Sequence, residues 1–468
     1  MAQSDVHSDD TIAKQGATRE RFVQRRHLLF GAAAVGVGAV AIAATSASKA
    51  NATVLTGHDE VFNVHDYGAV GDGVHPDGPG IQAAINAAAA NPGGGTVYIP
   101  SGTYLVGATL TVATSHIAFR GEGPSSLLKG TFAAGDIISI APSGTQLLAG
   151  TILENFAIYS TVSKTSGAAV SFRYVQDVRI VGLQCASRDV AGSGNYLYDG
   201  LTFSNFTGVT VETAMLTSHH CGLSVAADTN AGGVGADIWV TGGTIISNAT
   251  IGVYAGGGVG GLYLDEVDIF GNGTHVLVDT ALSATSSPNR ELIFNNCVLD
   301  TAQNHGVEIM ANGVYVLSFN ATYGGNTGSL AQAGHPDGCI IRVHAGGILH
   351  PSSIVVNGCK FFNAYGDAIY AESGSWSITG CDISYNAQGT AGGYGIYLTG
   401  AATSNSMLVG NSIRENGAYP SAKPVGVGIR IDSSVNAYLI ADNLVTDNGT
   451  AAITESGGPK KLVANNLS

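Results

Sequence analysis

The chain has 468 residues, of which 66 are Gly and only 12% are charged, and its formal net charge is −14. Average soluble proteins contain roughly 7% Gly and about 25% charged residues, so this composition is typical of many short strands and tight turns. The 45% hydrophobic content excludes a disordered chain. The acidic balance excludes nucleic acid and anionic membrane surfaces as partners, because binding to phosphates requires Lys and Arg.

Residues 1–52 have the pattern of an export signal. The pair Arg25-Arg26 precedes an apolar run at 27–47 that is rich in Ala, Gly and Val, and an Ala-Asn-Ala sequence at 50–52 provides a small-residue cleavage site. The paired arginines resemble those of twin-arginine signals. We therefore predict a periplasmic or secreted protein with no stable membrane span after signal removal. The alternative is a retained transmembrane anchor.

Residues 53–130 are expected to form an N-terminal cap and the first coils of a repeat. Apolar residues at positions 81, 84, 85 and 88 have helical spacing, Pro79 stands near the helix start, and Pro92 follows its end. Two strand-like segments follow at 96–100 and 102–106. A helix in this place would cover the first coil, whose apolar core and strand edge would otherwise be exposed.

Residues 131–468 are predicted to be one repeat region. Each copy has a short strand, a turn that contains Asn, and a second strand, with a base period of about 22–24 residues. The clearer copies begin at Thr244, Val267, Cys297, Ala321, Cys359, Cys381, Asn411 and Asn443. Such a period indicates a solenoid, and the alternation of apolar and polar residues indicates strands. We predict an all-β fold, a right-handed parallel β-helix of about 10–12 coils, with the turn Asn in the left-handed conformation and Asn amides bonded along the axis.

The N-terminal cap region at 53–130 resembles a known superfamily. The sequence FNVHDYGAVGDGV begins at Phe62, IQAAINAAAA begins at Ile81, and GGGTVYIPSGTYLV begins at Gly93. Together they are similar to the opening segment of the pectate-lyase-like right-handed β-helix proteins, which include polygalacturonases, tailspike depolymerases and lyases. The resemblance covers 62–128 and implies the fold, whereas the chemistry must be argued from the site.

The candidate chemistry lies further along the chain. Aligning the strands that follow the Asn turns places His305, Asp337 and Asp367 in one slot on three successive coils. Two neighbouring carboxylates repel, so the pKa of one should rise and make it a proton donor near neutral pH. We predict that Asp337 and Asp367 are the general acid and base of glycoside hydrolysis, supported by His305. The predicted substrate-binding residues lie around them: Glu308, Arg342, His344, Tyr370, Glu372, Tyr397, Arg430 and Asp432. The register of the coil that carries Arg342 and His344 is open by one residue, and a shift would turn these two side chains inward.

This stretch is also similar to polygalacturonases. Their motifs NTDG and GDDCI have the counterparts HPDGCII at 335–341 and YGDAIY at 365–370, which implies that Asp337 and Asp367 are the acid/base carboxylates. Gly366 replaces the first Asp of the second motif, and the motif GHG of that family is absent. We therefore expect a polysaccharide other than polygalacturonate as substrate.

Three alternatives remain open. Asp before Gly at a strand start is also a common turn residue. The same surface would suit a lyase that removes a proton beside an acidic sugar, with His305, His344, Arg342 or Tyr397 as the base. A protein that binds polysaccharide without turnover, as a homotrimer like the tailspikes, is the third.

No cofactor is expected. The acidic group Asp265, Glu266 and Asp268 is interpreted as a solvated turn, with a calcium site as the alternative. The six cysteines contain no CxxC pair, so the sequence does not indicate zinc. The cysteines 297, 359 and 381 share one slot of the repeat and are expected to be buried thiols.

Overall fold

The computed structural model describes residues 60–186, 196–227, 235–279, 289–328, 338–349, 354–389, 393–417 and 426–468. The expected export signal at 1–52 lies outside these residues. In the described part, no helix has the length and apolar character needed to cross a membrane.

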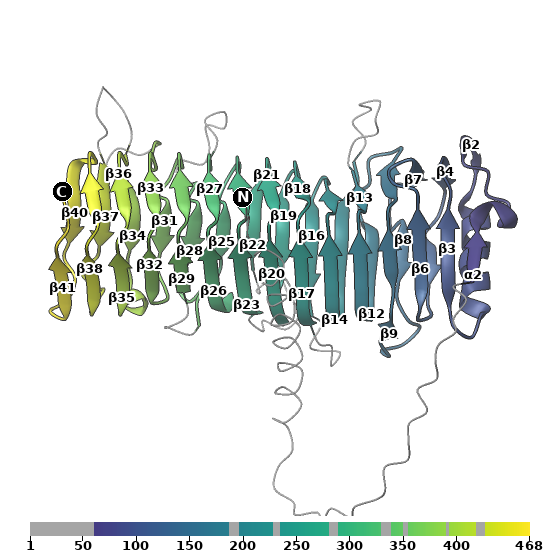
Figure 1. Cartoon of the computed structure of the whole chain (residues 1–468), viewed down its shortest axis with the longest axis horizontal. Coiled ribbons are helices and arrows are strands. Elements are labelled where there is room, and N and C mark those ends of the chain that lie inside the picture. Colours follow the sequence, from purple (N-terminus) through teal and green to yellow (C-terminus); the bar gives the residue numbers. More distant parts are fainter. Residues whose placement is uncertain are drawn as a thin grey trace, which may run out of the picture. The chain divides into compact units, whose positions relative to one another are not determined.

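Two parallel sheets wind together as successive coils (Figure 1). Within the described residues, the smaller sheet has 14 strands, each on a different coil. They are β2 (Asp72–Pro76), β4 (Gly102–Val106), β7 (Ser126–Gly130), β11 (Ala157–Ser160), β13 (Gln184–Cys185), β15 (Met215–Leu216), β18 (Thr244–Ile246), β21 (Asp268–Phe270), β24 (Val298–Asp300), β27 (Tyr323–Gly325), β30 (Lys360–Phe362), β33 (Asp382–Ser384), β36 (Ser412–Arg414) and β39 (Leu444–Thr446).

The larger sheet has two series of strands, which are joined because β12 (Ala168–Val181) and β14 (Asp199–Glu212) run through both. The first series contains β1 (Val61–Asn63), β3 (Gly95–Ile99), β6 (Ile117–Gly121), β9 (Leu148–Ala149), β10 (Ile152–Glu154), β17 (Gly235–Thr241), β20 (Val259–Asp265), β23 (Asn289–Asn295), β26 (Val314–Asn320), β29 (Ile354–Asn357), β32 (Trp376–Thr379), β35 (Ser406–Val409), β38 (Tyr438–Ala441) and β41 (Lys461–Ala464).

The second series carries the candidate site. It contains β5 (Leu110–Val112), β8 (Ile138–Ile140), β16 (Cys221–Ala226), β19 (Ile251–Ala255), β22 (Thr274–Val278), β25 (Val307–Ile309), β28 (Ile341–Val343), β31 (Ile369–Ala371), β34 (Tyr394–Leu398), β37 (Gly426–Ile431) and β40 (Gly449–Glu455). The structure also has one α-helix, α2 (Gly78–Ala90), and two 3-10 helices in the described residues, η2 (Val64–Tyr67) and η5 (Ala401–Thr403).

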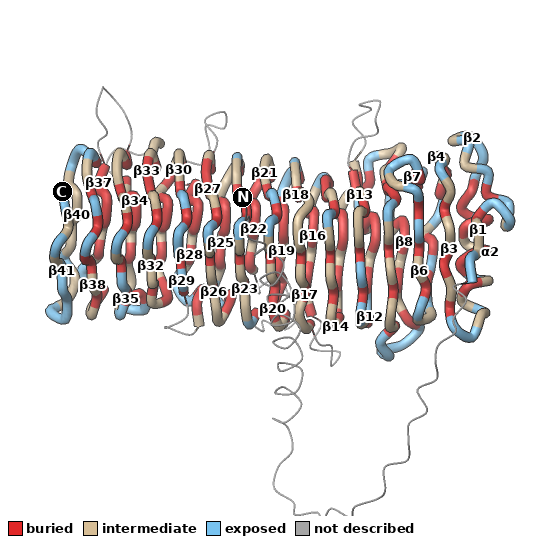
Figure 2. The backbone as a smooth tube through the Cα atoms, viewed as in Figure 1, coloured by how far each residue is buried: buried red, intermediate tan, exposed pale blue. Residues whose placement is uncertain are grey.

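Inward-facing apolar residues set the register of the coils. Val276, Val307, Ile341 and Ile369 pair in sequence along the second series, and all four are fully buried. Buried and more exposed positions alternate along each coil (Figure 2). The predicted all-β parallel β-helix is confirmed. The 14 strands of the smaller sheet exceed the predicted 10–12 coils, because the first coils lack the Asn turn from which coils were counted.

The predicted N-terminal cap is also present. Helix α2 buries Ile81, Ala84, Ile85 and Ala88 against the first coils. The fully buried Asp77, which precedes the helix, accepts hydrogen bonds through Oδ1 from the backbone N–H of Val70 (2.6 Å) and Gly71 (3.2 Å). Its Oδ2 accepts from the N–H of Leu105 at 3.0 Å. One carboxylate thus joins the opening segment to β4.

Asn side chains bond along the axis as expected. Asn386 donates its backbone N–H and its Nδ2 to Oδ1 of Asn416, at 3.0 and 3.1 Å. Asn416 repeats both bonds to Asn448, each at 3.0 Å. Because these amides are buried, each oxygen satisfies donors that would otherwise lack a partner.

The prediction that these Asn residues adopt the left-handed conformation is wrong in most copies. It holds for Asn326 and Asn363, whose φ values are 52° and 58°. In other copies the preceding residue has the positive φ, as with Tyr385 at 59° and Glu415 at 55°. That residue turns the chain out of the strand, so the next side chain points into the corner of the coil.

Removing one of the hydrogen-bonded Asn side chains along the axis should destabilise the fold strongly. We expect Asn416→Ala to lower the free energy of unfolding by roughly 2–6 kcal/mol, because two buried donors of Asn386 lose their acceptor at about 1–3 kcal/mol each. Urea denaturation checks this, with Asn86→Ala on the exposed face of α2 as the control. A loss for Asn416→Ala no larger than that of the control would contradict the bonding role.

All six cysteines are buried and free of disulfides. Cys297, Cys359 and Cys381 each stand directly before a strand of the smaller sheet, as their shared slot predicted. The predicted buried thiols are therefore confirmed.

Candidate functional site

Three rows of side chains run along the second series, with one residue of each row on each coil. The strand pairing defines the central row, which contains Ser139, Ser171, Thr202, Ser224, Tyr254, Leu277, Glu308, Arg342, Tyr370, Tyr397 and Arg430. Three residues earlier lies the strand-start row: Asp136, Ala168, Asp199, Cys221, Ile251, Thr274, His305, Cys339, Asp367, Tyr394 and Val427. Two residues after the central row lies the distal row, which includes Arg173, Ser204, Asp279, Met310, His344, Glu372, Thr399 and Asp432.

The central row confirms part of the sequence alignment. Glu308, Tyr370, Tyr397 and Arg430 share it as predicted, and Arg342, whose orientation the sequence left open, lies between Glu308 and Tyr370. The distal row brings His344 and Glu372 onto neighbouring coils beside them. All the predicted substrate-binding residues therefore occupy two adjacent rows.

Asp337 lies outside the described residues, but the strand pairing fixes what occupies its predicted slot. Val307 pairs with Ile341, so the residue opposite His305 is Cys339. The predicted alignment of Asp337 with His305 and Asp367 is therefore wrong. The alignment used the glycines that follow His305 and Asp337, whereas the inward-facing Ile341 starts its strand two residues later than that match implied.

The strand-start row has a structural function of its own. Its polar side chains accept the backbone N–H of the next coil: Asp136 from Ala168 at 2.8 Å, Asp199 from Cys221 at 3.0 Å, His305 from Cys339 at 3.0 Å and Asp367 from Tyr394 at 2.7 Å. The turn-residue interpretation thus accounts for one oxygen of Asp367 and one nitrogen of His305. These bonds use Oδ1 of Asp367 and Nδ1 of His305, and Nε2 of His305 faces Glu308.

Glu308 lies between two imidazoles. Its Oε1 is 3.0 Å from His344 Nε2 and 3.8 Å from His305 Nε2. Because His305 Nδ1 accepts the Cys339 N–H, the proton of a neutral His305 is on Nε2, which faces Glu308. Burial opposes ionisation of Glu308, but the bond from His344 and the charges of both imidazoles and Arg342 outweigh it and hold its pKa below the usual value. Glu308 is therefore an ionised carboxylate at neutral pH.

Asp367 is shifted in the opposite direction. Burial raises its pKa from 3.8 to about 7, against the backbone hydrogen bond from Tyr394 and the positive charge of Arg342. Near neutral pH, a large fraction of Asp367 is thus protonated and can donate a proton. Arg342 acts on both carboxyl groups, because its charge lowers the pKa of Asp367 and of Glu308.

Arg342 is held by two neighbours on the next coil. Its Nη2 is 3.3 Å from Glu372 Oε1, and its guanidinium carbon lies 3.8 Å from the centre of the Tyr370 ring. Its Nη1 is buried and has no hydrogen-bond partner among the described residues. A buried guanidinium N–H without a partner is costly, so this atom is a candidate contact for an anionic ligand group.

Tyrosines continue the surface toward the C-terminus. The Tyr370 and Tyr397 ring centres are 4.9 Å apart, and the Tyr394 and Tyr397 ring centres are 4.7 Å apart. The Tyr397 hydroxyl donates to Asp432 Oδ2 at 3.1 Å, and Arg430 follows Tyr397 in the central row. Aromatic rings beside carboxylate and guanidinium groups provide both stacking and polar contacts for a sugar.

In the part of the chain that the structure describes, no three His, Cys, Asp or Glu side chains gather in a way that could hold a metal ion. Asp265, Glu266 and Asp268 therefore do not form such a group.

Replacing Arg342 should change both carboxyl groups in the same direction. We expect the pKa values of Asp367 and Glu308 to rise in Arg342→Gln, because both lose a nearby positive charge. Titration of the carboxyl carbons by NMR measures both values. Arg290→Gln, which removes an exposed guanidinium from β23 of the first series, is the control. Unchanged values in Arg342→Gln would show that the guanidinium does not couple the two groups.

The comparisons with known proteins agree with this architecture. The model of the family Rhamnogalacturonase A/epimerase, pectate lyase-like, matches residues 61–328, which is more than half of the chain. The chain belongs to this family. A second model, Right handed beta helix region, matches residues 345–467 and includes Asp367 and Tyr397. The predicted right-handed β-helix is thereby confirmed over nearly all of the described coils.

Individual relatives match short parts of the chain. Mannuronan C5-epimerase AlgE1 of Azotobacter vinelandii is 41% identical over 97 residues, which are 20% of this chain and 6% of the epimerase. The tail spike protein of Shigella phage Sf6 is 33% identical over 138 residues, which are 28% of this chain and 18% of that protein. The chain thus spans only a small part of these curated relatives. The solved A-module of Azotobacter vinelandii epimerase AlgE6 has a TM-score of 0.51 at 16% identity, over 87% of this chain and 98% of the module, which shows the fold alone.

Sequence reasoning missed some members of the three rows. Cys339 orients His305 through its backbone N–H, which no side-chain pattern could indicate. Asp136, Ser171 and Arg173 occupy the same rows on earlier coils, where the Asn turns that anchored the alignment are absent. Extending the rows upstream through Asp199, which also precedes a Gly at a strand start, would have found them.

Proposed function

We propose that the protein is an exported, carbohydrate-active enzyme that hydrolyses glycosidic bonds of an acidic polysaccharide. Asp367 would be the general acid and Glu308 the carboxylate that activates water or attacks the sugar. The observation that carries this proposal is the opposite direction of the two pKa shifts, upward to about 7 for Asp367 and downward for Glu308. Two carboxyl groups with separated pKa values are the usual requirement for paired acid and base roles.

The other residues fit supporting roles. Arg342 and Arg430 would bind acidic groups of the substrate, and the rings of Tyr370 and Tyr397 would stack on sugar faces. His305 and His344 would hold Glu308 in place and keep it ionised. Asp337 has no role in this proposal, because the strand pairing places Cys339 in its predicted slot opposite His305.

One observation favours a second candidate, proton removal from a uronate by a lyase or an epimerase. Arg342 Nη1 is buried without a partner among the described residues, and Arg342 is the register partner of Glu308 on the next coil, beside His305 and His344. An arginine that neutralises the sugar carboxylate makes the adjacent C–H more acidic, and Glu308 or an imidazole would take the proton. The similarity to mannuronan C5-epimerases supports this alternative.

A product assay with the mature protein separates these reactions. The panel would contain acidic and neutral polysaccharides, and three signals would be read: reducing ends, ultraviolet absorbance of unsaturated uronates, and inversion at C5 by NMR. Reducing ends alone support hydrolysis. Reducing ends with absorbance indicate a lyase, and C5 inversion without new ends indicates an epimerase; either result overturns the hydrolase proposal. Binding without any product would support a non-catalytic polysaccharide-binding protein, for which a homotrimer is the proposed assembly.

A further inference from the structure

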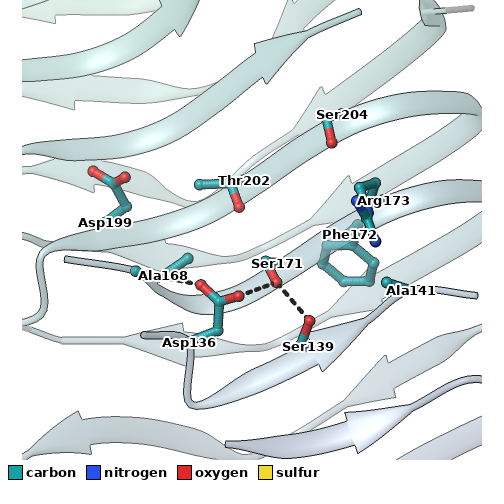
Figure 3. A pocket seen from close by; sticks show the side chains of 11 residues that line it. Asp136, Ser139, Ala141, Ala168, Ser171, Phe172, Arg173, Asp199, Thr202 and Ser204 are labelled. Carbon is teal, nitrogen blue, oxygen red and sulfur yellow. Dashed lines mark hydrogen bonds between the residues drawn. The ribbon is translucent and has the colours of Figure 1, made fainter. Parts of the chain in front are cut away.

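A second polar site lies on the same series of strands. A pocket of about 410 Å³ is formed over β8, β12 and β14 (Figure 3). Asp136 and Asp199 of the strand-start row lie on one side, and Arg173 of the distal row lies on the other. The hydroxyl groups of Ser171 and Thr202, from the central row, lie between them. The pocket therefore uses the same three rows as the site around Glu308.

The carboxylates of this pocket are fixed by the fold. Asp136 accepts the Ala168 N–H through Oδ1 at 2.8 Å and the Ser171 hydroxyl through Oδ2 at 2.6 Å. Within the described residues, Asp199 makes its contacts through Oδ1, to the Cys221 N–H at 3.0 Å and to His220 Nδ1 at 2.8 Å. The Oδ2 atom of Asp199 thus remains able to accept a hydroxyl group of a ligand.

The opposite side of the pocket is positively charged. Arg173 is exposed, and its guanidinium carbon lies 5.9 Å from the centre of the Tyr174 ring. No carboxylate of the described residues forms an ion pair with it. A guanidinium without a protein carboxylate is suited to a bidentate contact with a ligand carboxylate. A pocket with a carboxylate, hydroxyl groups and a guanidinium in one line matches a sugar ring that carries both hydroxyls and an acidic group.

The distance to the candidate catalytic site follows from the register. Five strand pairings separate Ser171 from Glu308 in the central row. At about 4.8 Å per strand, the two positions are roughly 24 Å apart along the axis. A polymer lying along the rows would reach both sites, whereas a single sugar would not.

We propose that this pocket is a distal subsite that binds one uronate unit of the same acidic polysaccharide. The sugar carboxylate contacts Arg173, and its hydroxyl groups contact Asp199 and Thr202. The assignment rests on the proposed function for the nature of the polymer, but its contacts belong to the pocket alone. The pocket anchors long chains whose reacting bond lies about five coils away.

The test is calorimetric binding of long oligogalacturonates and oligomannuronates to the full mature chain. We expect Arg173→Gln to weaken binding by about tenfold, the effect of one lost hydrogen-bonded charge pair. Thr202→Val should weaken it by roughly two- to tenfold, the effect of one lost neutral hydrogen bond. Arg290→Gln on β23 of the first series removes a comparable charge and should bind like the parent protein. Equal affinities of parent and Arg173→Gln, or no binding of either oligomer to the parent protein, would overturn the subsite.

Turnover of the same oligomers distinguishes this proposal from the proposed function. Binding that depends on Arg173 in a protein without turnover would overturn the hydrolase and support the subsite. Turnover in a protein whose binding ignores Arg173 would overturn the subsite and support the hydrolase.

Discussion

Asp367→Asn should lower kcat/KM on the polysaccharide substrate by about 10²–10⁴-fold, the usual effect of removing a general acid. The amide oxygen can still accept the Tyr394 N–H, so the strand-start bond and the fold should survive. Asp268→Asn, on the exposed face of β21 in the smaller sheet, is the matched control and should keep full activity. Full turnover by Asp367→Asn would remove Asp367 from the mechanism.

The pH dependence gives an independent check on the same residue. A general acid must be protonated, so activity of the parent protein should fall as the pH rises through about 7, the pKa of Asp367. The pH dependence of folding stability has the same sign, because the free energy of unfolding should also fall as the pH rises. Folding raises the pKa of Asp367 from 3.8 to about 7. Its stabilising contribution to the free energy of unfolding is therefore fully present below pH 3.8 and is lost as the pH rises to about 7. Asp367→Asn should lack this decline, which thermal unfolding across the pH range measures.

Glu308→Gln should lower kcat/KM by a similar factor, about 10²–10⁴-fold, because the amide cannot take a proton or attack the sugar. The acid limb of the pH profile, which reports ionisation of Glu308 below 4.5, should disappear in whatever activity remains. Steady-state rates across the pH range measure both effects. A rise in KM alone, with kcat unchanged, would instead make Glu308 a substrate-binding residue.

The control for Glu308→Gln must separate a loss of catalytic rate from a loss of folding stability. Since its pKa is lowered on folding, Glu308 stabilises the fold above its unfolded value of 4.5, and this contribution is lost as the pH falls. Glu308→Gln should therefore be somewhat less stable at neutral pH, and its activity is compared at a temperature where it stays folded. Glu212→Gln, in an exposed pair with Arg179, controls for the loss of a surface charge.

The sequence allowed prediction of the features that repeat from coil to coil. The alternation of inward and outward residues placed Glu308, Tyr370, Tyr397 and Arg430 in one row, because a shift by one residue would bury polar groups in the core. The helical spacing of Ile81 and its neighbours predicted the cap in the same way. These features follow from burial, which the residue type reveals directly.

The predictions that were wrong depend on geometry between neighbouring coils. The alignment of Asp337 relied on a local Asp-Gly pair, but the strand begins where Ile341 enters the core, and the number of residues between consecutive strands of the series varies along the sequence. The upward shift of the Asp367 pKa was expected from a second Asp, whereas the structure attributes it first to burial. The position of a loop and the depth of a side chain are set by neighbouring coils, which the linear sequence does not display.

Among the described residues, each strand pairs with strands of the neighbouring coils, so the binding surface can change its length by whole coils. Each strand of the second series takes its register from the coil before it and passes that register to the coil after it. A duplicated coil would add one residue to every row and lengthen the surface by about 4.8 Å, while the other contacts stay as they were. Duplication of a single coil would therefore change the distance between Arg173 and Glu308 by one strand spacing and leave the residues of both sites unchanged.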